Sequence, residues 1–269
     1  MKIHPTAIID PGAILHPGVE IGPYCIVEKG AEIGEGSYLE SHVKIHGSVK
    51  MGKNNKIYHG TALGGTPQDL AFKPETKSYL IIGDNNTIKE FANYHRASKE
   101  GSATKIGNGN FLMGHTHIAH DCVVGDNCIM VSCACLAGHV IAGNNVFVSG
   151  VSAVHQFVVL GNNAMIAGCS KIVKDIPPFV TADGNPATVI GLNTVGLKRA
   201  GFPADVRTAI KKAYKVFYHS GLNTKQALAE MAKEQNHIPE VQMIIDFFAN
   251  SKRGVTDHRS VGGGEKEEE

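Results

Sequence analysis

Residues that could do acid–base chemistry are concentrated near the middle of the chain. Three histidines and an aspartate lie between positions 115 and 121: His115, His117, His120 and Asp121. A neutral imidazole acts as a general base near physiological pH, and an adjacent carboxylate can orient it and raise its basicity. The same residue types also bind zinc. The pattern alone therefore leaves general base catalysis and a metal site both open.

A six-residue repeat indicates the scaffold that positions these side chains. Stepping by six from Ile3 to Leu63 gives only aliphatic residues, and stepping from Ile82 to Ile172 gives mostly apolar ones, with Glu100 and Ala142 the weak members. Neither a helical nor a two-residue period explains this spacing. We expect short strands and tight turns, with three hexads in each triangular coil. The hexads predict nine coils, a prism roughly 43 Å long at about 4.8 Å per coil.

The 18-residue coil predicts which polar residues meet. It places His139 one coil beyond Asp121 and Gln156 two coils beyond His120, with His155 beside Gln156. A lone histidine would be structural, but several polar groups on neighbouring coils favour a site along one edge of the prism. Successive residues of a strand point to opposite faces. A contact between His120 and Asp121 therefore requires a corner or a bend.

The repeat also predicts the domain organisation. The prism spans residues 1–190, with two excursions at 68–81 and 96–105, each either a functional loop or a tolerated surface insertion. The second excursion keeps the hexad frame but is polar. Residues 191–255 have a helical pattern, with helices expected to begin near Pro203, near Asn223 or Thr224, and at Pro239. We expect the tail, residues 256–269 ending in GGGEKEEE, to be disordered.

Composition excludes several classes of protein. The 269 residues carry a formal net charge of +1, whereas proteins that bind nucleic acid or membranes mainly by charge are more basic. No apolar run reaches 18 residues, the N-terminus lacks the apolar region of a signal peptide, and the six cysteines form no CxxC pair. We therefore expect a cytoplasmic protein with reduced thiols, no nucleic-acid partner and no stable membrane insertion.

The hexad pattern resembles that of the hexapeptide-repeat acyltransferases. The resemblance implies a mainly β fold, a left-handed parallel β-helix of hexapeptide repeats, here with a C-terminal α-helical domain. Six strings make it more specific: HIAHDC (117–122), LAGHV (136–140), AVHQF (153–157), DIPPFV (175–180), DGNPAT (183–188) and GLKRAGF (196–202). They resemble the acyl-[acyl carrier protein]–UDP-N-acetylglucosamine O-acyltransferase family, which starts lipid A biosynthesis, over nearly the whole chain.

This resemblance implies a role for each matching residue. His120 corresponds to the general base that deprotonates the sugar 3-position, Asp121 to its supporting carboxylate, and the backbone N–H of Gly138 to the oxyanion donor. Gly168 and Lys171 correspond to positions that measure acyl-chain length. Seven residues correspond to substrate-binding positions: Asp69, His117, His139, His155, Gln156, Asn193 and Arg199.

The resemblance also implies the partners. These are acyl carrier protein as the acyl donor, a UDP-sugar as the acceptor, and two further copies of the chain in a homotrimer with active sites between subunits. No metal or cofactor is implied. Exposed lysines on the expected helices form either a solvated face or a docking surface for the acidic carrier protein: Lys211, Lys212, Lys215, Lys225 and Lys233.

The sequence departs from the family pattern in places. Ala71 stands where many members have a phosphate-contacting lysine, and Val195 and Ala200 replace an acidic and a basic residue. An acceptor with a 3-amino group, giving an amide, therefore remains open, as do the acyl-chain length and hydroxylation. Two alternatives come from other classes: a zinc enzyme like the β-helix carbonic anhydrases, and a β-helix that serves only as a scaffold.

Overall fold

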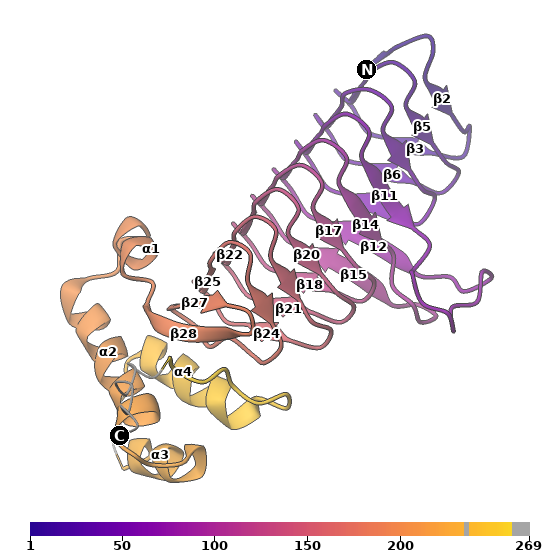
Figure 1. Cartoon of the computed structure of the whole chain (residues 1–269). Helices are drawn as coiled ribbons and strands as arrows, with labels where there is room; N and C mark the ends of the chain where they lie inside the picture. Colours follow the sequence, from indigo (N-terminus) through magenta and orange to yellow (C-terminus); the bar gives the residue numbers. More distant parts are fainter. Residues whose placement is uncertain (234–236, 260–269) are drawn as a thin grey trace, which may run out of the picture.

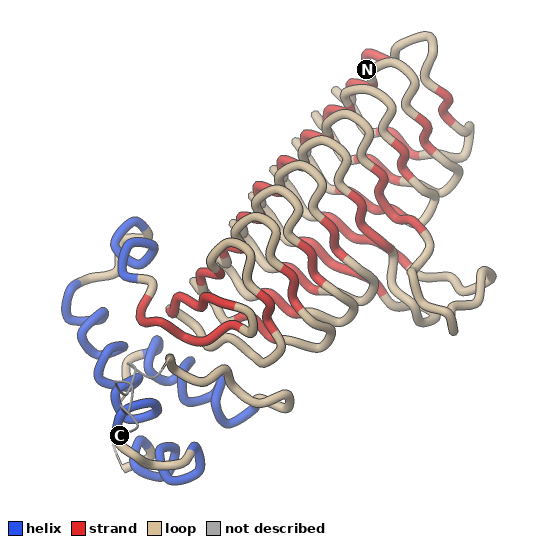
Figure 2. Tube along the Cα trace, viewed as in Figure 1, coloured by secondary structure: helices blue, strands red, loops and turns tan. Residues whose placement is uncertain are grey.

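The computed structural model describes residues 1–233 and 237–259, and most of them wind into a three-sided prism (Figure 1). Short strands on each side stack into a parallel sheet, separated by turns at the three corners (Figure 2). The prism is a left-handed parallel β-helix, with the helical domain at its C-terminal end. The predicted fold class is confirmed.

The three sides are named sheets A, B and C. Sheet A contains β1 (Lys2–Ile3), β4 (Glu20–Ile21), β7 (Tyr38–Leu39), β10 (Lys56–Ile57), β13 (Thr87–Ile88), β16 (Phe111–Leu112), β19 (Ile129–Met130), β22 (Phe147–Val148), β25 (Met165–Ile166), β27 (Val180–Gly184) and β28 (Ala187–Leu192). Sheet B contains β2 (Ile8–Ile9), β5 (Ile26–Val27), β8 (Lys44–Ile45), β11 (Ala62–Gly65), β14 (Asn93–His95), β17 (His117–Ile118), β20 (Cys135–Leu136), β23 (Ala153–Val154) and β26 (Lys171–Ile172). Sheet C contains β3 (Ile14–Leu15), β6 (Glu32–Ile33), β9 (Val49–Met51), β12 (Tyr79–Ile82), β15 (Ala103–Ile106), β18 (Val123–Val124), β21 (Ile141–Ala142) and β24 (Val159–Leu160).

Strand register confirms the 18-residue coil. His117 pairs with Cys135, and Ile118 with Leu136, the residues one coil further on. The aliphatic hexad residues point inward and form the core, and Leu112 and Ile118 have no exposed surface. Each such side chain contributes roughly 1.5–3 kcal/mol by burial. Only the open N-terminal end differs, where Ile3 is 43% exposed.

The register also shows how much chain each excursion adds. Lys56 pairs with Thr87, 31 positions later, and Thr87 pairs with Phe111, 24 positions later. The first excursion therefore adds 13 residues and the second adds six. Because the second insertion equals one hexad, it leaves the count in phase, so the predicted excursion at 96–105 is present but Glu100 is not a hexad position. Glu100 lies in a turn of this loop.

Both excursions leave the prism at the corner between sheets B and C. The first connects β11 to β12 and the second connects β14 to β15. The next turn at this corner, between β17 and β18, contains His120 and Asp121. The loops and the candidate base are therefore on consecutive coils of one corner.

The C-terminal helices start where the sequence predicts. They are α1 (Thr194–Arg199), α2 (Ala204–His219), α3 (Thr224–Met231) and α4 (Pro239–Asn250). Asn223 caps α3 in a capping box with Gln226, and Pro239 opens α4. Two elements between the prism and α2 were not predicted from the sequence: the β27–β28 hairpin and α1. None of the helices in the described part of the chain is long and apolar enough to cross a membrane.

The segment after α4 returns to the end of the prism. Buried Asp175 accepts hydrogen bonds from the Val159 N–H and the Ser251 hydroxyl, and it pairs with Val255. His258 then forms a bridge with Val189 of β28. Residues 256–259 are therefore ordered against the protein, and that part of the predicted tail is wrong. Residues 260–269 lie outside the described residues.

Candidate active site

His120 and Asp121 occupy the turn between β17 and β18, and this turn brings their side chains together. Asp121 has a left-handed backbone with φ of 60°. His139 and Phe157 occupy the same turn position in the next two coils, with φ of 62° and 66°. In a strand, the side chains of His120 and Asp121 would point to opposite faces. The left-handed backbone of Asp121 instead turns its side chain to the same side as that of His120. The predicted need for a corner is therefore met.

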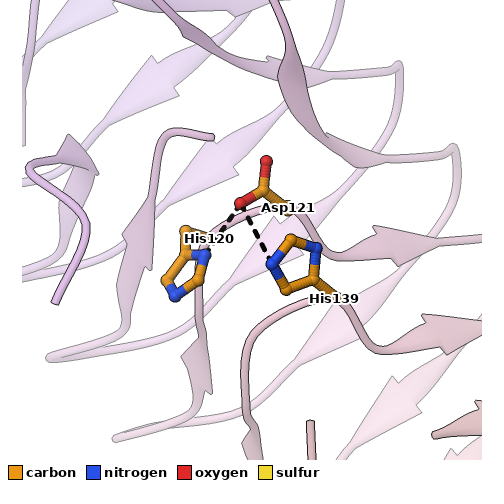
Figure 3. A group of neighbouring side chains, drawn as sticks. All are labelled: His120, Asp121 and His139. Atoms are coloured by element: carbon orange, nitrogen blue, oxygen red, sulfur yellow. Dashed lines mark hydrogen bonds and ion pairs between the residues drawn. The ribbon is translucent and has the colours of Figure 1, made fainter. Parts of the chain in front are cut away.

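The two side chains form a hydrogen-bonded pair. Nδ1 of His120 lies 2.8 Å from Oδ2 of Asp121, and Nε2 of His139 lies 3.7 Å from the same oxygen. Figure 3 shows both imidazoles turned toward Asp121. An ionised carboxylate only accepts hydrogen bonds, so Nδ1 of His120 is its donor. In the neutral imidazole, Nε2 of His120 then keeps a free lone pair.

The second excursion contributes a residue that sequence reasoning missed. Ser98 donates to Asp121 from its hydroxyl at 2.6 Å and from its backbone N–H at 3.2 Å. The Asp121 N–H in turn donates to the buried Thr104 hydroxyl at 2.8 Å. The available signal was the polar composition of this loop, but only the location of the excursion at the B–C corner identifies Ser98 as a neighbour of Asp121.

Burial and hydrogen bonding have opposite effects on the Asp121 carboxyl. Burial alone would raise its pKa, but the hydrogen bonds from Ser98 and His120 and the nearby His139 outweigh it, so the pKa is lowered. Burial lowers the pKa of His139, although the Asp121 charge opposes this. At neutral pH, Asp121 is therefore an anion beside a neutral His139.

Gly138 lies directly against the ring of His120. A Cβ at this position would approach Cε1 of His120 to 2.7 Å and Nε2 to 2.9 Å, closer than van der Waals contact permits. Glycine is therefore required for the imidazole to lie over this backbone. Within the described chain, the Gly138 N–H donates no hydrogen bond. An unused donor is thus adjacent to the candidate base.

His117 lies on sheet B, one strand residue before the core position Ile118. Its ring is perpendicular to that of His95, with centroids 5.0 Å apart. His95 is only 3% exposed, its Nδ1 has no hydrogen-bond partner among the described residues, and burial lowers its pKa to about 4. Burial also lowers the pKa of His117. This pair is therefore neutral at pH 7.

The remaining residues at the B–C corner lie further from the dyad. Exposed His155 and Gln156 follow β23, and Gln156 has the turn position of His120 two coils on. Asp69 is exposed in the first excursion, where its carboxylate accepts from the Ala71 N–H at 2.9 Å. The charge of Asp69 also reaches His139, where it acts to raise the pKa. These predicted residues therefore share the edge of the prism with His120.

Other predicted residues are elsewhere on the single chain. Asn193 caps α1, and with Arg199 it lines a cavity of about 450 Å³ against Phe147 and Met165 on sheet A. Gly168 is exposed in a turn at the A–B corner. Asn193 and Arg199 therefore lie beside sheet A and Gly168 at the A–B corner, whereas His120 lies at the B–C corner.

Three of the described residues have the donor set of a metal site. One ligand atom each from His120, Asp121 and His139 lies within 4.8 Å of the others. Catalytic zinc sites do use three protein ligands. Here, however, Asp121 already accepts hydrogen bonds from His120 and Ser98, and His120 would have to give up its hydrogen bond to bind a cation through Nδ1. The geometry favours a hydrogen-bonded dyad.

Comparison with known proteins defines the class of this β-helix. The family described as bacterial transferase hexapeptide (six repeats) matches residues 1–34 and 103–138. The second of these ranges contains His120 and Asp121, so the class of the protein is that of the hexapeptide transferases. The family described as UDP N-acetylglucosamine O-acyltransferase, domain 2, matches residues 175–256.

Solved structures identify the family of the whole chain. UDP-N-acetylglucosamine O-acyltransferase from Moraxella catarrhalis is 42% identical, covers 95% of this chain and 100% of its own, and has a TM-score of 0.91. The Francisella novicida UDP-N-acetylglucosamine acyltransferase is 36% identical, with 96% and 95% covered and a TM-score of 0.91. The Campylobacter jejuni enzyme is 35% identical, with 96% and 100% covered and a TM-score of 0.90. The chain belongs to the UDP-N-acetylglucosamine O-acyltransferase family and is an acyltransferase.

Proposed function

We propose that this acyltransferase moves an acyl chain, which can carry a 3-hydroxyl, from acyl carrier protein to the 3-hydroxyl of UDP-N-acetylglucosamine, the first step of lipid A biosynthesis. The observation that carries the proposal is the His120–Asp121 hydrogen bond beside the unused N–H of Gly138. A base and an oxyanion donor in contact are the two groups that acyl transfer from a thioester requires.

The reaction follows from the protonation state of the dyad. Nε2 of His120 takes the proton from the sugar hydroxyl as the oxygen attacks the thioester carbonyl. The Gly138 N–H stabilises the negative oxygen of the tetrahedral intermediate, and Asp121 stabilises the imidazolium. When the intermediate collapses, the C–S bond breaks and His120 returns the proton to the departing thiolate. The products are the acylated UDP-sugar and the free thiol of the carrier protein.

Sheet B provides a surface for the acyl chain. From His117, the outward strand positions on successive coils are Cys135, Ala153 and Lys171. Small side chains leave space along three coils, or about 14 Å at the spacing of strands. Lys171 then limits the apolar path, and Gly168 in the adjoining turn leaves room for a longer chain. We propose these two residues as determinants of chain length.

We propose that the substrate contacts come from more than one copy of the chain. Asn193 and Arg199 line a cavity against sheet A, and we propose that they bind the nucleotide at the dyad of a neighbouring subunit in a homotrimer. His117, His139, His155, Gln156 and Asp69 complete the site at the B–C corner. Exposed Lys211, Lys212 and Lys215 on α2 offer positive charge to the acidic carrier protein.

An acylation assay tests the proposal. It offers UDP-N-acetylglucosamine and its 3-amino analogue, each with carrier-protein thioesters of increasing chain length, and zinc is measured in the same preparation. We expect an ester product from the 3-hydroxyl sugar without stoichiometric zinc. Exclusive amide formation would show that the acceptor is the 3-amino sugar. That alternative was left open because Ala71 stands where many family members have a lysine. Absence of any acyl transfer together with stoichiometric zinc would overturn the proposal in favour of a zinc enzyme.

A further inference from the structure

Arg253, just after α4, contacts His155 of the candidate site. Nη2 of Arg253 lies 2.9 Å from Nδ1 of His155, and its Nε donates to the Val173 carbonyl at 2.8 Å. Val173 is the first residue after β26, and His155 is the first residue after β23. Because β23 and β26 pair in register, the two residues have equivalent positions on adjacent coils. The guanidinium therefore bridges two successive coils at the edge where His155 is exposed.

The contact determines which imidazole nitrogen carries the proton. A guanidinium is always charged and has only donors, so Nδ1 of His155 must accept from Arg253. The Gln156 carbonyl lies 3.2 Å from the same Nδ1 and would instead require a proton there. The two contacts exclude each other, and the shorter, charge-assisted one is the stronger. The proton of neutral His155 is then on Nε2.

Arg253 is held in place before any substrate arrives. On one side, the Ser251 hydroxyl donates to the buried Asp175 carboxylate at 2.6 Å. On the other, the Asp175 N–H donates to the Gly254 carbonyl and the Thr256 N–H donates to the Asp175 carbonyl. These bonds fix the backbone on both sides of Arg253, and the hydrogen bond from its Nε to the Val173 carbonyl restrains the side chain that holds His155.

We propose that Arg253 is a positioning residue that keeps His155 in the Nε2–H form, so that this N–H donates to a carbonyl oxygen on the acyl donor. The inference rests on the proposed function for the identity of the ligand. The C-terminal segment thereby has a role in the site. The sequence gives no sign of this role, since Arg253 lies 98 positions after His155.

The tautomer is measured on the resting protein, independently of any reaction. Histidine rings labelled with ¹⁵N give distinct two-bond ¹H–¹⁵N patterns for the two neutral forms, and the His155 signals are those absent from His155→Gln. We expect the Nε2–H pattern in the wild type, and a shift toward the Nδ1–H form in Arg253→Met. Arg259→Met is the matched control, because Arg259 belongs to the same segment but contacts Asp183 and Thr188.

Kinetics then test the consequence for the acyl donor. We expect Arg253→Met to raise KM for the acyl donor about tenfold, the effect of one hydrogen bond of about 1.4 kcal/mol, while KM for the sugar changes little. Arg253→Lys, which retains a donor, restores part of this loss. An Nδ1–H pattern in the wild type would overturn the positioning role. So would an Nε2–H pattern that stays unchanged in Arg253→Met. Because the spectra need no substrate, that outcome differs from failure of the proposed acyl transfer.

Discussion

Two corners of the prism use the same backbone geometry for different purposes. At the corner between sheets C and A, Asn127 and Asn145 have φ of 55° and 57°, close to the 60° of Asp121 at the B–C corner. Beside them, side-chain amides and carboxylates bond from coil to coil: the Asp126 N–H donates to Asn144 and the Asn108 N–H to Asp126. Inside this corner, Asn86 and Asn110 form a buried ladder.

The difference lies in whether the polar groups are satisfied within the chain. At the C–A corner the ladder groups are hydrogen-bonded to partners on the neighbouring coil, which stabilises the stack. At the B–C corner, Nε2 of His120 and the N–H of Gly138 have no hydrogen-bond partner within the part of the chain that the structure describes. We infer that the first corner determines stability and the second determines activity, and four substitutions test this division.

The largest effect is expected for His120→Ala. It removes the proposed base, so kcat should fall by about 10²–10⁴-fold, the usual contribution of a general base. The thermal unfolding midpoint should change little, since His120 lies in a turn at the surface of the prism. His115→Ala is the control, because His115 has φ of 58° in a turn at the A–B corner and stacks on Phe91. Wild-type turnover by His120→Ala would refute the assignment of the base.

Gly138→Ala should also reduce kcat, by about 10²-fold. The added Cβ, 2.7 Å from Cε1 of His120, displaces the ring from its position. The paired variant is Gly107→Ala at the C–A corner, where the Cβ would lie 2.7 Å from the Gly125 carbonyl oxygen. That variant should unfold at lower temperature yet keep its turnover per folded molecule. Equal losses of activity in both variants would show that the corners do not differ in this way.

Asn110→Ala should destabilise the protein without affecting chemistry. Asn110 is 1% exposed, accepts from the Cys128 N–H at 2.7 Å and donates to Asn86 at 2.9 Å. Its loss leaves buried polar groups unpaired, and we expect a loss of about 2–4 kcal/mol in the free energy of unfolding. Denaturant titration measures this, with exposed Asn144→Ala as the milder comparison. An unchanged midpoint would contradict the role of the buried ladder.

Ser98→Ala should have the smallest effect at neutral pH, less than about tenfold in kcat. The hydroxyl and the backbone N–H of Ser98 both help to lower the pKa of Asp121. Ser98→Ala removes only the hydroxyl donor, so it raises that pKa part of the way toward its usual value. Asp121 then becomes protonated at a higher pH, and the acid limb of the activity profile moves upward. Ser102→Ala, in the same loop but bonded to the Lys99 carbonyl, should leave the limb in place. A limb that stays fixed in Ser98→Ala would exclude this coupling.

The sequence was sufficient for the repeat because burial imposes it on every coil. The inward side chains must be aliphatic and the corners narrow, so the period of six, the sheet register and the positions of His117, His120 and Gln156 on one edge could be counted along the chain. Local signals also predicted the start of α3 near Asn223 or Thr224 and of α4 at Pro239. The same counting failed at Glu100, because an inserted loop of one hexad leaves the frame unchanged.

Only the tertiary structure decided what surrounds the dyad. Ser98 meets Asp121 because the second excursion leaves at the B–C corner, and Arg253 meets His155 because Asp175 holds the C-terminal segment against the prism. No sequence period relates these residues. Their proximity follows from the path of the loops and from long-range hydrogen bonds, whereas the repeat depends on a pattern of burial that each hexad carries by itself.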